Sequence, residues 1–574
     1  IISSGRNIAA GDTVVCALNY DASAGEFYFW DSQNYTVKTG TVASADFSTI
    51  NPVLLGASPF GGYINGMVGE VTVYSQSLRA DHYKKTRDML AQKWIKRPNI
   101  VLIYVDDWAW NGSSVAMDKR MPNSEMPSII EMPNLDSMAS NGMVFRNAYG
   151  SPQCSPARAA IQTGQSNARN GFTVFMSSSD FYNSKAIDPG DDYYGFPVLP
   201  NGADATLKTN AVSIAEALAP LGYKSALFGK WHLRDHPENE GYYAPDGATS
   251  NNEGNNYNDA TGLEGLEDPK MMSHITDNGM AYMEDAVDAG LPFFVMLSHY
   301  AMHAGNECLP TSRARYQTQS AVVAYNDGET DPAELSRNND PAVWLGMAYE
   351  LDLKIGEVRQ KLVELGIEDN TYVIVVADNG YRHEFFDGLF GLSQPLHMRK
   401  WWAWQGGIRV PMVAEGPGIP SGADCTANVV NYDFLPTFYD WAGGDTNQLQ
   451  DLDGISLAGL MQGEIPTDTF LNRSLYFHYP HYRSTMPHSV VVRGTDKVVY
   501  FYETAVTHPA WSPIMLFDLA NDVGEYHNVY SNNTALGDAL YADMTNYFST
   551  VGARTPLVPN PDYDSGIYYA TDTN

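Results

Sequence analysis

One short run of the chain combines residue types that could do chemistry together, the sequence CSPAR at residues 154–158. Ser155 is a good helix N-cap and Pro156 suits the first helical position, so we expect a helix to begin directly after them. Cys154 would then lie at a helix N-terminus, where unpaired backbone N–H groups favour anions. Arg158 lies on the same helical face, and its guanidinium could reach position 154. The alternative is a buried free cysteine before an ordinary helix.

Acidic and amide side chains follow two apolar runs of strand length. Asp106 and Asp107 come after one run, and Asp378 and Asn379 come after another. All four offer oxygen ligands without neighbouring Cys or His, a set that suits a hard divalent cation, calcium more than zinc. Adjacent aspartates at a strand end also need a cation, because like charges repel. The residues 378–380 alone would indicate a turn, but their pairing with the first two aspartates favours a metal site.

Basic and imidazole side chains follow two further strand-like runs. Lys230 and His232 are two positions apart, so they would point to the same side if the strand continued through them. His303 follows the other run, with His299 as its rival. Ligands of open parallel sheets bind beyond the carboxyl ends of the strands, so we expect these side chains to meet the acidic cluster there.

The elements that position these residues are those of an α/β protein. Apolar runs of strand length alternate with helical stretches from residue 97 onward, which indicates a mostly parallel sheet. We expect strands over residues 99–105, 223–228, 293–298 and 371–377, and helices over 131–141, 157–163, 213–221, 275–289 and 342–365. Beyond residue 472 the hydrophobic period becomes two, over 474–479, 489–493 and 498–502, which predicts a small antiparallel C-terminal subdomain.

The first 95 residues differ from the rest of the chain. Short alternating runs such as 13–18 and 26–30 are separated by turn residues, a pattern typical of an antiparallel β-sandwich. The run 62–74, followed by a helical stretch over 78–92, resembles the closing part of a laminin-G or concanavalin-like domain. That resemblance implies carbohydrate binding, while a spacer module is the alternative.

Length and charge narrow the function further. The 574 residues are too many for one ordinary domain, and we expect three: residues 1–95, 96–470 and 471–574. The net charge of −32 argues against a nucleic-acid or anionic-membrane partner. No apolar run approaches the length of a transmembrane helix. The four cysteines do not form a disulfide framework; Cys308 and Cys425 could bridge, but free thiols are favoured.

Several separated motifs over residues 97–529 resemble those of the type I sulfatases of the alkaline phosphatase superfamily. Residues 154–158 fill the three fixed positions of the Cys-x-Pro-x-Arg motif, and residues 229–233 match Gly-Lys-Trp-His-Leu. The run from Lys400 to Pro411 resembles the family's Lys-(x)4-Glu-Gly-Gly-Ile-Arg-Val-Pro, with Gln405 in place of the Glu.

The resemblance implies an α/β fold with helices on both faces of the sheet and a secreted or periplasmic enzyme that cleaves sulfate esters. It implies that a formylglycine-generating enzyme oxidises Cys154 before or during folding. An aldehyde hydrate can attack sulfur and then expel sulfate, whereas a thiol would leave a stable adduct. The implied catalytic residues are Cys154, Arg158, Lys230, His232, His303 and Lys400, and the implied ligands of one Ca²⁺ are Asp106, Asp107, Cys154, Asp378 and Asn379.

The substrate is less sharply defined by the sequence. The sandwich-like segment, the acidic composition and the His-rich stretch with His478, His481 and His488 favour a sulfated, marine algal-type polysaccharide or its oligosaccharides. Candidate substrate contacts are Arg234, His299, Arg382, His383, Trp401 and Trp404, although tryptophans more often fill a core. The alternatives are an arylsulfatase of broad specificity, a phosphoester or phosphonate hydrolase, and a non-catalytic carbohydrate-binding protein.

Overall fold

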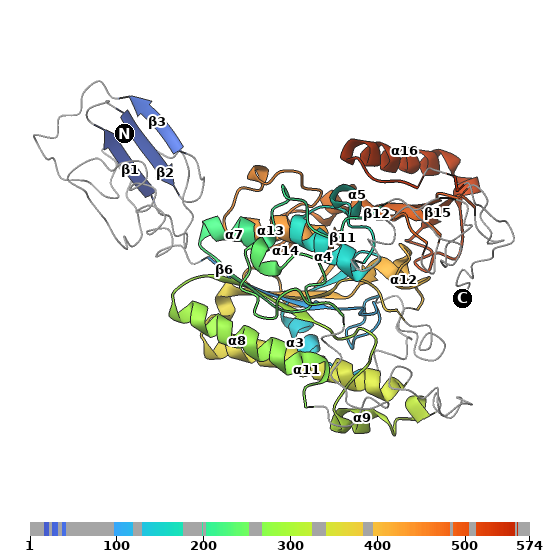
Figure 1. The fold of residues 1–574 in the computed structure, drawn as a ribbon, viewed down its shortest axis with the longest axis horizontal. Coiled ribbons are helices and arrows are strands. Elements are labelled where there is room, and N and C mark those ends of the chain that lie inside the picture. The colour runs from blue at the N-terminus through green and yellow to red at the C-terminus, as the bar shows by residue number, and fades with distance from the viewer. Residues whose placement is uncertain are drawn as a thin grey trace, which may run out of the picture. The chain divides into compact units, whose positions relative to one another are not determined.

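The chain forms two compact units, Ile1–Arg97 and Pro98–Asn574. A computed structural model of the chain is drawn in Figure 1. The structure describes residues 16–21, 26–31, 37–41, 97–118, 129–175, 198, 202–251, 267–323, 340–382, 394–482, 486–503, 512–556 and 559–560.

The first unit contains a three-stranded antiparallel sheet. Its strands are β1 (Cys16–Asp21), β2 (Glu26–Asp31) and β3 (Val37–Thr41), paired in chain order. Two of these strands coincide with alternating runs that the sequence predicted. The predicted run 62–74 and the helix over 78–92 lie outside the described residues.

The second unit is built on an eight-stranded mixed sheet in the order β11-β5-β10-β8-β4-β7-β6, with β9 paired to β5. The strands β8, β4, β7 and β6 are mutually parallel, while β10 runs antiparallel to both of its neighbours. Their bounds are β4 (Asn99–Val105), β5 (Met143–Tyr149), β6 (Lys224–Gly229), β7 (Phe293–His299), β8 (Thr371–Ala377), β9 (Arg409–Val410), β10 (Met412–Glu415) and β11 (Ala423–Val430). The mostly parallel sheet confirms the prediction.

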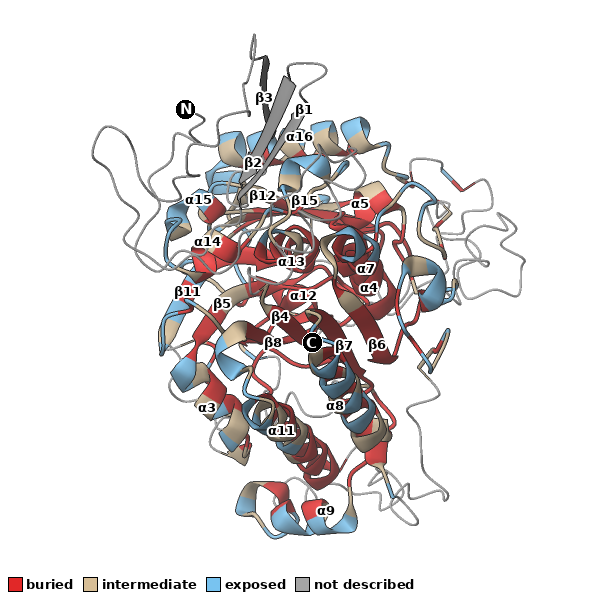
Figure 2. Cartoon of the chain, turned by 90° about the vertical axis from the view of Figure 1, so that its left-hand side faces the viewer, coloured by how far each residue is buried: buried red, intermediate tan, exposed pale blue. Residues whose placement is uncertain are grey.

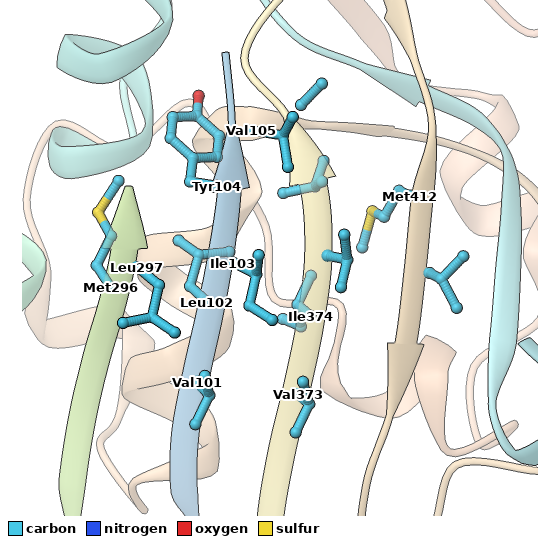
Figure 3. Packing of buried hydrophobic residues seen from close by; sticks show 14 of the residues in the cluster. Val101, Leu102, Ile103, Tyr104, Val105, Met296, Leu297, Val373, Ile374 and Met412 are labelled. Atoms are coloured by element: carbon cyan, nitrogen blue, oxygen red, sulfur yellow. The ribbon is translucent and has the colours of Figure 1, made fainter. Parts of the chain in front are cut away.

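Continuous apolar sequence explains the central strands. Every residue of β4, β7 and β8 is buried. Leu102 of β4 pairs with Ile374 on one side and Met296 on the other, and the side chains form the packed layer in Figure 3. Burial on both faces removes the polar alternation that an exposed sheet face would show, which is why these strands read as unbroken hydrophobic runs.

Helices cover both faces of this sheet (Figures 1 and 2). One face carries α3 (Pro133–Asn141), α8 (Met272–Asp288) and α11 (Pro341–Glu364), and the other carries α4 (Cys154–Thr163), α7 (Ile214–Leu218) and α13 (Phe434–Trp441). Shorter helices are α5 (Asn167–Asn170), α9 (Pro310–Tyr316), α12 (Gln405–Ile408), α14 (Ala458–Met461) and α15 (Thr467–Leu471). The two-sided cover agrees with the expected fold class.

One local prediction was wrong. Helix α4 begins at Cys154, and its N-cap is Gln153 rather than Ser155. Pro156 is therefore the third helical residue, where its missing N–H costs no intrahelical hydrogen bond. Strand β6 ends at Gly229, so it does not continue through Lys230 and His232.

A second sheet forms the predicted antiparallel C-terminal subdomain. Its strands β12 (Ser474–Tyr479), β13 (His488–Arg493), β14 (Asp496–Phe501) and β15 (Ile514–Asp518) pair in chain order. Helix α16 (Thr534–Val551) packs on one face of this sheet through Leu540, Met544 and Phe548. The other face packs against Trp402 and Trp404, and so against the segment that carries Lys400.

Among the described helices, none is long and apolar enough to cross a bilayer. Cys154, Cys308 and Cys425 are buried and free. The Cys308–Cys425 bridge that the sequence left open is therefore not formed, and the free thiols are confirmed.

Candidate active site

Most of the predicted site residues lie just beyond the carboxyl ends of four neighbouring strands of the mixed sheet. Val105, the last residue of β4, pairs with the last residues of β7 and β8, His299 and Ala377. The next residue of one strand is tied to its neighbour, because Asp378 N donates to Val105 O at 3.0 Å. Asp107 and Asp378, which are 271 positions apart in the chain, thus follow adjacent strand ends, as the parallel topology requires.

Three carboxylates form the centre of the site. Asp106, Asp107 and Asp378 bring ligand oxygens within 4.8 Å of one another. All three are fully buried. The backbone N–H of Asp107 donates to Asp378 Oδ1 at 3.0 Å, and Asn379 Nδ2 donates to Asp107 Oδ1 at 2.7 Å. The predicted ligands therefore do converge on one point.

Basic side chains surround the carboxylates. Lys230 Nζ donates to Asp106, and Lys400 Nζ donates to both oxygens of Asp107 at 2.5 and 2.7 Å. Arg158 lies 3.3 Å from Asp378, and His303 Nε2 lies 3.7 Å from Asp107. Pairing of this kind is what allows charges to persist away from water. The predicted lysines and arginine thus meet the three carboxylates in one buried cluster.

Cys154 is the first residue of α4 and is 2 % exposed. Its Sγ lies 3.2 Å from His232 Nδ1. Arg158, one turn along the same helix, donates from one nitrogen to Lys230 O and to Ser298 Oγ, both at 2.6 Å. The arginine therefore fixes α4 to the ends of β6 and β7, while the cysteine faces the histidine.

The charges at the site shift the acid groups in opposite directions. Burial by itself would raise the pKa of Asp106, but Lys230 and the other nearby cations outweigh it and hold that pKa well below its usual range. Burial and the neighbouring Asp106 raise the pKa of Asp378 well above its usual range. Burial also raises the pKa of the Cys154 thiol. Two carboxylates this close cannot both ionise freely unless a cation joins them.

The two site histidines are held neutral. Burial first, and then Lys230, lowers the pKa of His232 well below its usual range. Burial and Lys400 do the same to the pKa of His303. Burial would lower the pKa of Lys400, but Asp107 outweighs it and raises that pKa. Lys400 therefore favours its charged form, while both imidazoles favour their neutral forms.

Two oxygen atoms of the cluster have no donor among the described residues. Asp106 Oδ1 and Asn379 Oδ1 are buried and accept no hydrogen bond. Buried acceptors are rarely left unsatisfied unless an ion or water takes the place of a donor. Carboxylate and amide oxygens are also the ligands that calcium prefers. The residues present therefore fit a hard divalent cation at this point.

Backbone strain accompanies this chemistry. Asp107, His232 and Trp401 have φ angles of 52°, 57° and 79°, in the left-handed region. Each such residue costs on the order of 1–3 kcal/mol when it is not glycine. The surrounding hydrogen bonds must offset that cost, and here they direct an aspartate and a histidine into the cluster.

Only some of the predicted substrate-contact residues are exposed. Trp404 is fully buried and packs on Phe517 at 5.0 Å, so it belongs to the core, and the prediction that it contacts substrate was wrong. His299 is 1 % exposed inside β7, and burial lowers its pKa to about 3, so it too is a core residue. Trp401 and Arg382 are partly exposed and Arg234 is exposed, and His383 lies outside the described residues.

Gln405 does not face the carboxylates. Its backbone N–H donates to Glu525 Oε2 at 2.6 Å, and its side-chain oxygen accepts from Tyr149 at 3.3 Å. Glu525 in turn pairs with Lys497, and both are fully buried beneath the second sheet. Gln405, which replaces the Glu of the motif, therefore lies where the two sheets pack together, away from the acidic cluster.

Sequence reasoning missed Ser298. Its hydroxyl accepts from Arg158 and donates to Lys230 O, each at 2.6 Å. A polar residue in the otherwise apolar strand β7 was the signal that could have revealed it. Such a residue must find buried partners, and in this fold the partners are two site residues.

This chain is similar to known proteins over most of its length. Residues 98–444 match the sulfatase family model, and residues 397–549 match the model of the N-sulphoglucosamine sulphohydrolase C-terminal family. A sulfatase of Formosa agariphila is 27 % identical over 514 residues, which covers 76 % of this chain and 85 % of that protein. The N-acetylglucosamine-6-O-sulfatase of Bacteroides thetaiotaomicron is 24 % identical over 536 residues, covering 78 % and 84 %.

Among solved structures, Ps i-CgsB in complex with k-i-k-neocarrahexaose shares the fold. It has a TM-score of 0.58 and 22 % identity, and the match covers 79 % of this chain and 93 % of that one. The family match spans well over half of the sequence and includes the strand ends that form the acidic cluster. The chain belongs to the sulfatase family, whose members are sulfuric ester hydrolases.

Proposed function

We propose that this protein hydrolyses sulfate esters of a carbohydrate and that residue 154, oxidised to formylglycine, is its nucleophile. The observation that carries the proposal is the convergence on one buried edge of Cys154, three carboxylates and the surrounding cations. A sulfate ester needs a nucleophile at sulfur, positive charge around its oxygens and a proton for the leaving alcohol. The site offers residues for all three.

Asp106, Asp107, Asp378 and Asn379, with the oxygen of modified residue 154, would hold one Ca²⁺. When bound, that cation would lower the pKa of an attacking hydroxyl and neutralise charge on the sulfate oxygens. The fixed charges of Arg158, Lys230 and Lys400 would act on the same oxygens, because preorganised cations in a buried site need no reorganisation during the reaction.

As an aldehyde hydrate, residue 154 would supply one hydroxyl that bonds to sulfur and a second whose deprotonation expels sulfate and restores the aldehyde. His232 is placed to take that second proton, since its Nδ1 lies 3.2 Å from the side-chain atom of residue 154. The imidazole is neutral at its lowered pKa, so it can accept a proton at neutral pH.

On the other side of the cluster, His303 and Lys400 would serve the leaving group. Both side chains approach Asp107, His303 through Nε2 and Lys400 through Nζ. The His303 Nδ1 lies 3.0 Å from Ala304 O, a carbonyl that can only accept, so Nδ1 carries the proton of the neutral imidazole and Nε2, which faces Asp107, is an acceptor. As the sulfur–oxygen bond to the sugar breaks, its electron pair stays on the alcohol oxygen, which takes a proton from Lys400, the protonated member of this pair.

A sulfated carbohydrate is the substrate class that we propose, with marine algal-type polysaccharides and their oligosaccharides as the first choice. The support is that one relative is an N-acetylglucosamine-6-O-sulfatase and that a protein of the same fold was solved with neocarrahexaose. Trp401, Arg382 and Arg234 remain the proposed sugar contacts. A carbohydrate-binding role for residues 1–95 and a secreted or periplasmic location belong to the same proposal.

Mass spectrometry of the peptide that carries Cys154 tests the nucleophile. Conversion of thiol to aldehyde lowers the mass by about 18 Da relative to the encoded peptide. Protein made with a formylglycine-generating enzyme should show this loss and should release sulfate from sulfated oligosaccharides. The Cys154→Ala variant should fold and lack activity; if it keeps most of the activity, the proposal is wrong.

Parallel assays separate the remaining alternatives. A carbohydrate sulfatase should turn over a sulfated oligosaccharide faster than a small aryl sulfate, and either of them faster than the matching phosphate ester. A faster phosphate or phosphonate reaction would instead place the chain with the phosphoester hydrolases of the superfamily, and binding without turnover would indicate a non-catalytic lectin.

A further inference from the structure

The residues that reach the site from the end of β6 do not hold themselves in place. Strand β6 ends at Gly229, which has a φ angle of 91°, and His232 follows at 57°. A Cβ at Gly229 would lie 2.3 Å from Ser298 O, so only glycine fits. Both angles lie in the left-handed region, where a non-glycine residue is strained. Something outside this segment must therefore stabilise residues 229–232.

After residue 232 the chain leads away, and residues 243–249 come back to lie beside β6 and residues 229–232. Tyr243 forms a parallel bridge with Ala226: its N–H donates to Ser225 O, and its carbonyl accepts from Leu227 N. This part of the chain therefore lies along the outer side of β6, the last strand in the sheet order. Six residues later it reaches Thr249, which is buried, beside the end of β6.

Thr249 makes three hydrogen bonds to residues 229–232. Its Oγ1 donates to Gly229 O at 2.7 Å and accepts from Trp231 N at 2.8 Å, and its carbonyl oxygen accepts from His232 N at 2.8 Å. One side chain thus uses both its donor and its acceptor on the segment. Valine has the same shape but can make neither hydroxyl bond.

Asp246 holds the same segment from its other end. Its Oδ2 accepts from Gly229 N at 2.7 Å, and its Oδ1 lies 2.8 Å from His274 Nε2. Together with the bond from Lys230 N to Ser298 O at 2.8 Å, every backbone N–H of residues 229–232 has a partner outside the segment. The conformation that directs Lys230 and His232 to the cluster is therefore imposed from outside.

We propose that Thr249, supported by Asp246, is a positioning residue for the reaction. It holds Lys230 against Asp106 and His232 against residue 154, without contacting substrate or the reacting atoms itself. This inference rests on the proposed function for its kinetic consequence. Its structural content, the position of His232, does not depend on the substrate.

Thr249→Val tests the inference, with Thr249→Ser as the conservative variant. We expect Thr249→Val to lower kcat by about 10- to 100-fold with little change in KM, by the scale of residues that orient catalytic groups. Thr249→Ser keeps the hydroxyl and should restore most of kcat. A crystal structure of the valine variant should show His232 Nδ1 farther from residue 154 than the present 3.2 Å.

Thr371→Val is the matched control. Thr371 is also buried, and its hydroxyl donates to Ile367 O at 2.7 Å and accepts from Asn99 at 3.3 Å, at the opposite end of the sheet. This control should lower the melting temperature by a comparable amount and leave kcat unchanged. Equal effects of the two valine variants on stability and none on kcat would overturn the inference.

Asp246 provides a second route if Thr249→Val does not fold. Asp246→Ala removes the acceptor for Gly229 N, whereas Asp246→Asn keeps an oxygen there. The alanine variant should lose about 10-fold in kcat and the asparagine variant much less. If the wild-type protein has no sulfatase activity, the proposed function fails, and the displacement of His232 in the crystal structure still decides this inference.

Discussion

Two groups of buried histidines make an instructive comparison. His232 and His303 lie at the edge of the mixed sheet, while His478, His481 and His488 lie in or next to the antiparallel sheet. Burial lowers the pKa of every one of them. Burial therefore does not distinguish a catalytic histidine from a structural one in this protein.

The atoms that the histidines contact distinguish the two groups. His232 faces Cys154, and His303 faces Asp107. In the antiparallel sheet, by contrast, His478 lies 2.7 Å from Ser489 Oγ and 2.8 Å from Arg554 O, and His488 Nε2 accepts from Ala403 N at 2.9 Å. The second set satisfies backbone and hydroxyl groups, so the His-rich stretch is part of the packed subdomain and does not support a carbohydrate substrate.

The largest effect should come from the acidic cluster. We expect Asp378→Ala to lower kcat by on the order of 1,000-fold or more, because it removes a ligand and leaves Arg158 without its carboxylate. Calorimetric titration with Ca²⁺ should show weaker binding in the same variant. Asp352→Ala is the control: it removes a buried carboxylate that caps α3 and should reduce stability without reducing kcat. Unchanged Ca²⁺ affinity in Asp378→Ala would contradict the ligand assignment.

The two histidine sets should then separate in kinetics. His303→Gln should lower kcat by about 100- to 10,000-fold, the range for loss of a general acid or base. His478→Gln should leave kcat unchanged for the folded protein and lower the free energy of unfolding, since it disturbs contacts to Ser489 and Arg554. Steady-state kinetics and urea unfolding on both variants check this. A fall in kcat of equal size in both would remove the distinction drawn here.

Acid should destabilise the protein by protonating His478 and His488. The pKa values of His478 and His488 are lowered by burial to about 4. A histidine with a depressed folded pKa stabilises fully above its unfolded pKa of about 6.5 and loses that contribution as pH falls toward 4. Each histidine contributes at most roughly 3 kcal/mol. Unfolding free energies measured from pH 7 to pH 4 should fall less steeply in the His478→Gln/His488→Gln double variant than in the wild type.

The smallest effect concerns the cysteines. Cys154 faces the site, whereas Cys308 and Cys425 lie in the core of the mixed sheet as free thiols. Thiol titration in denaturant should find three thiols, the four encoded minus the converted Cys154. A reducing agent should leave the melting temperature unchanged. One thiol, or a drop in melting temperature on reduction, would reveal a disulfide.

Particular residues show where sequence reasoning stopped. The acidic cluster was predictable because Asp106 and Asp378 each follow a strand that burial on both faces makes easy to recognise. The burial of Trp404 was not, because its partner Phe517 lies on a strand of the second sheet. The role of Thr249 was hidden for a similar reason: a loop threonine gains meaning only from the backbone that it meets.

The amino-acid sequence by itself determined the four central parallel strands and the polar residues that follow them, since hydrophobic runs and strand ends are local properties. Only the tertiary structure decided which charges meet. Lys400 contacts Asp107 across 293 positions, and Arg158 contacts Asp378 across 220. Such pairs form only after the sheet has closed the long loops between them, because the entropy of loop closure must be offset by packing before a distant contact can persist.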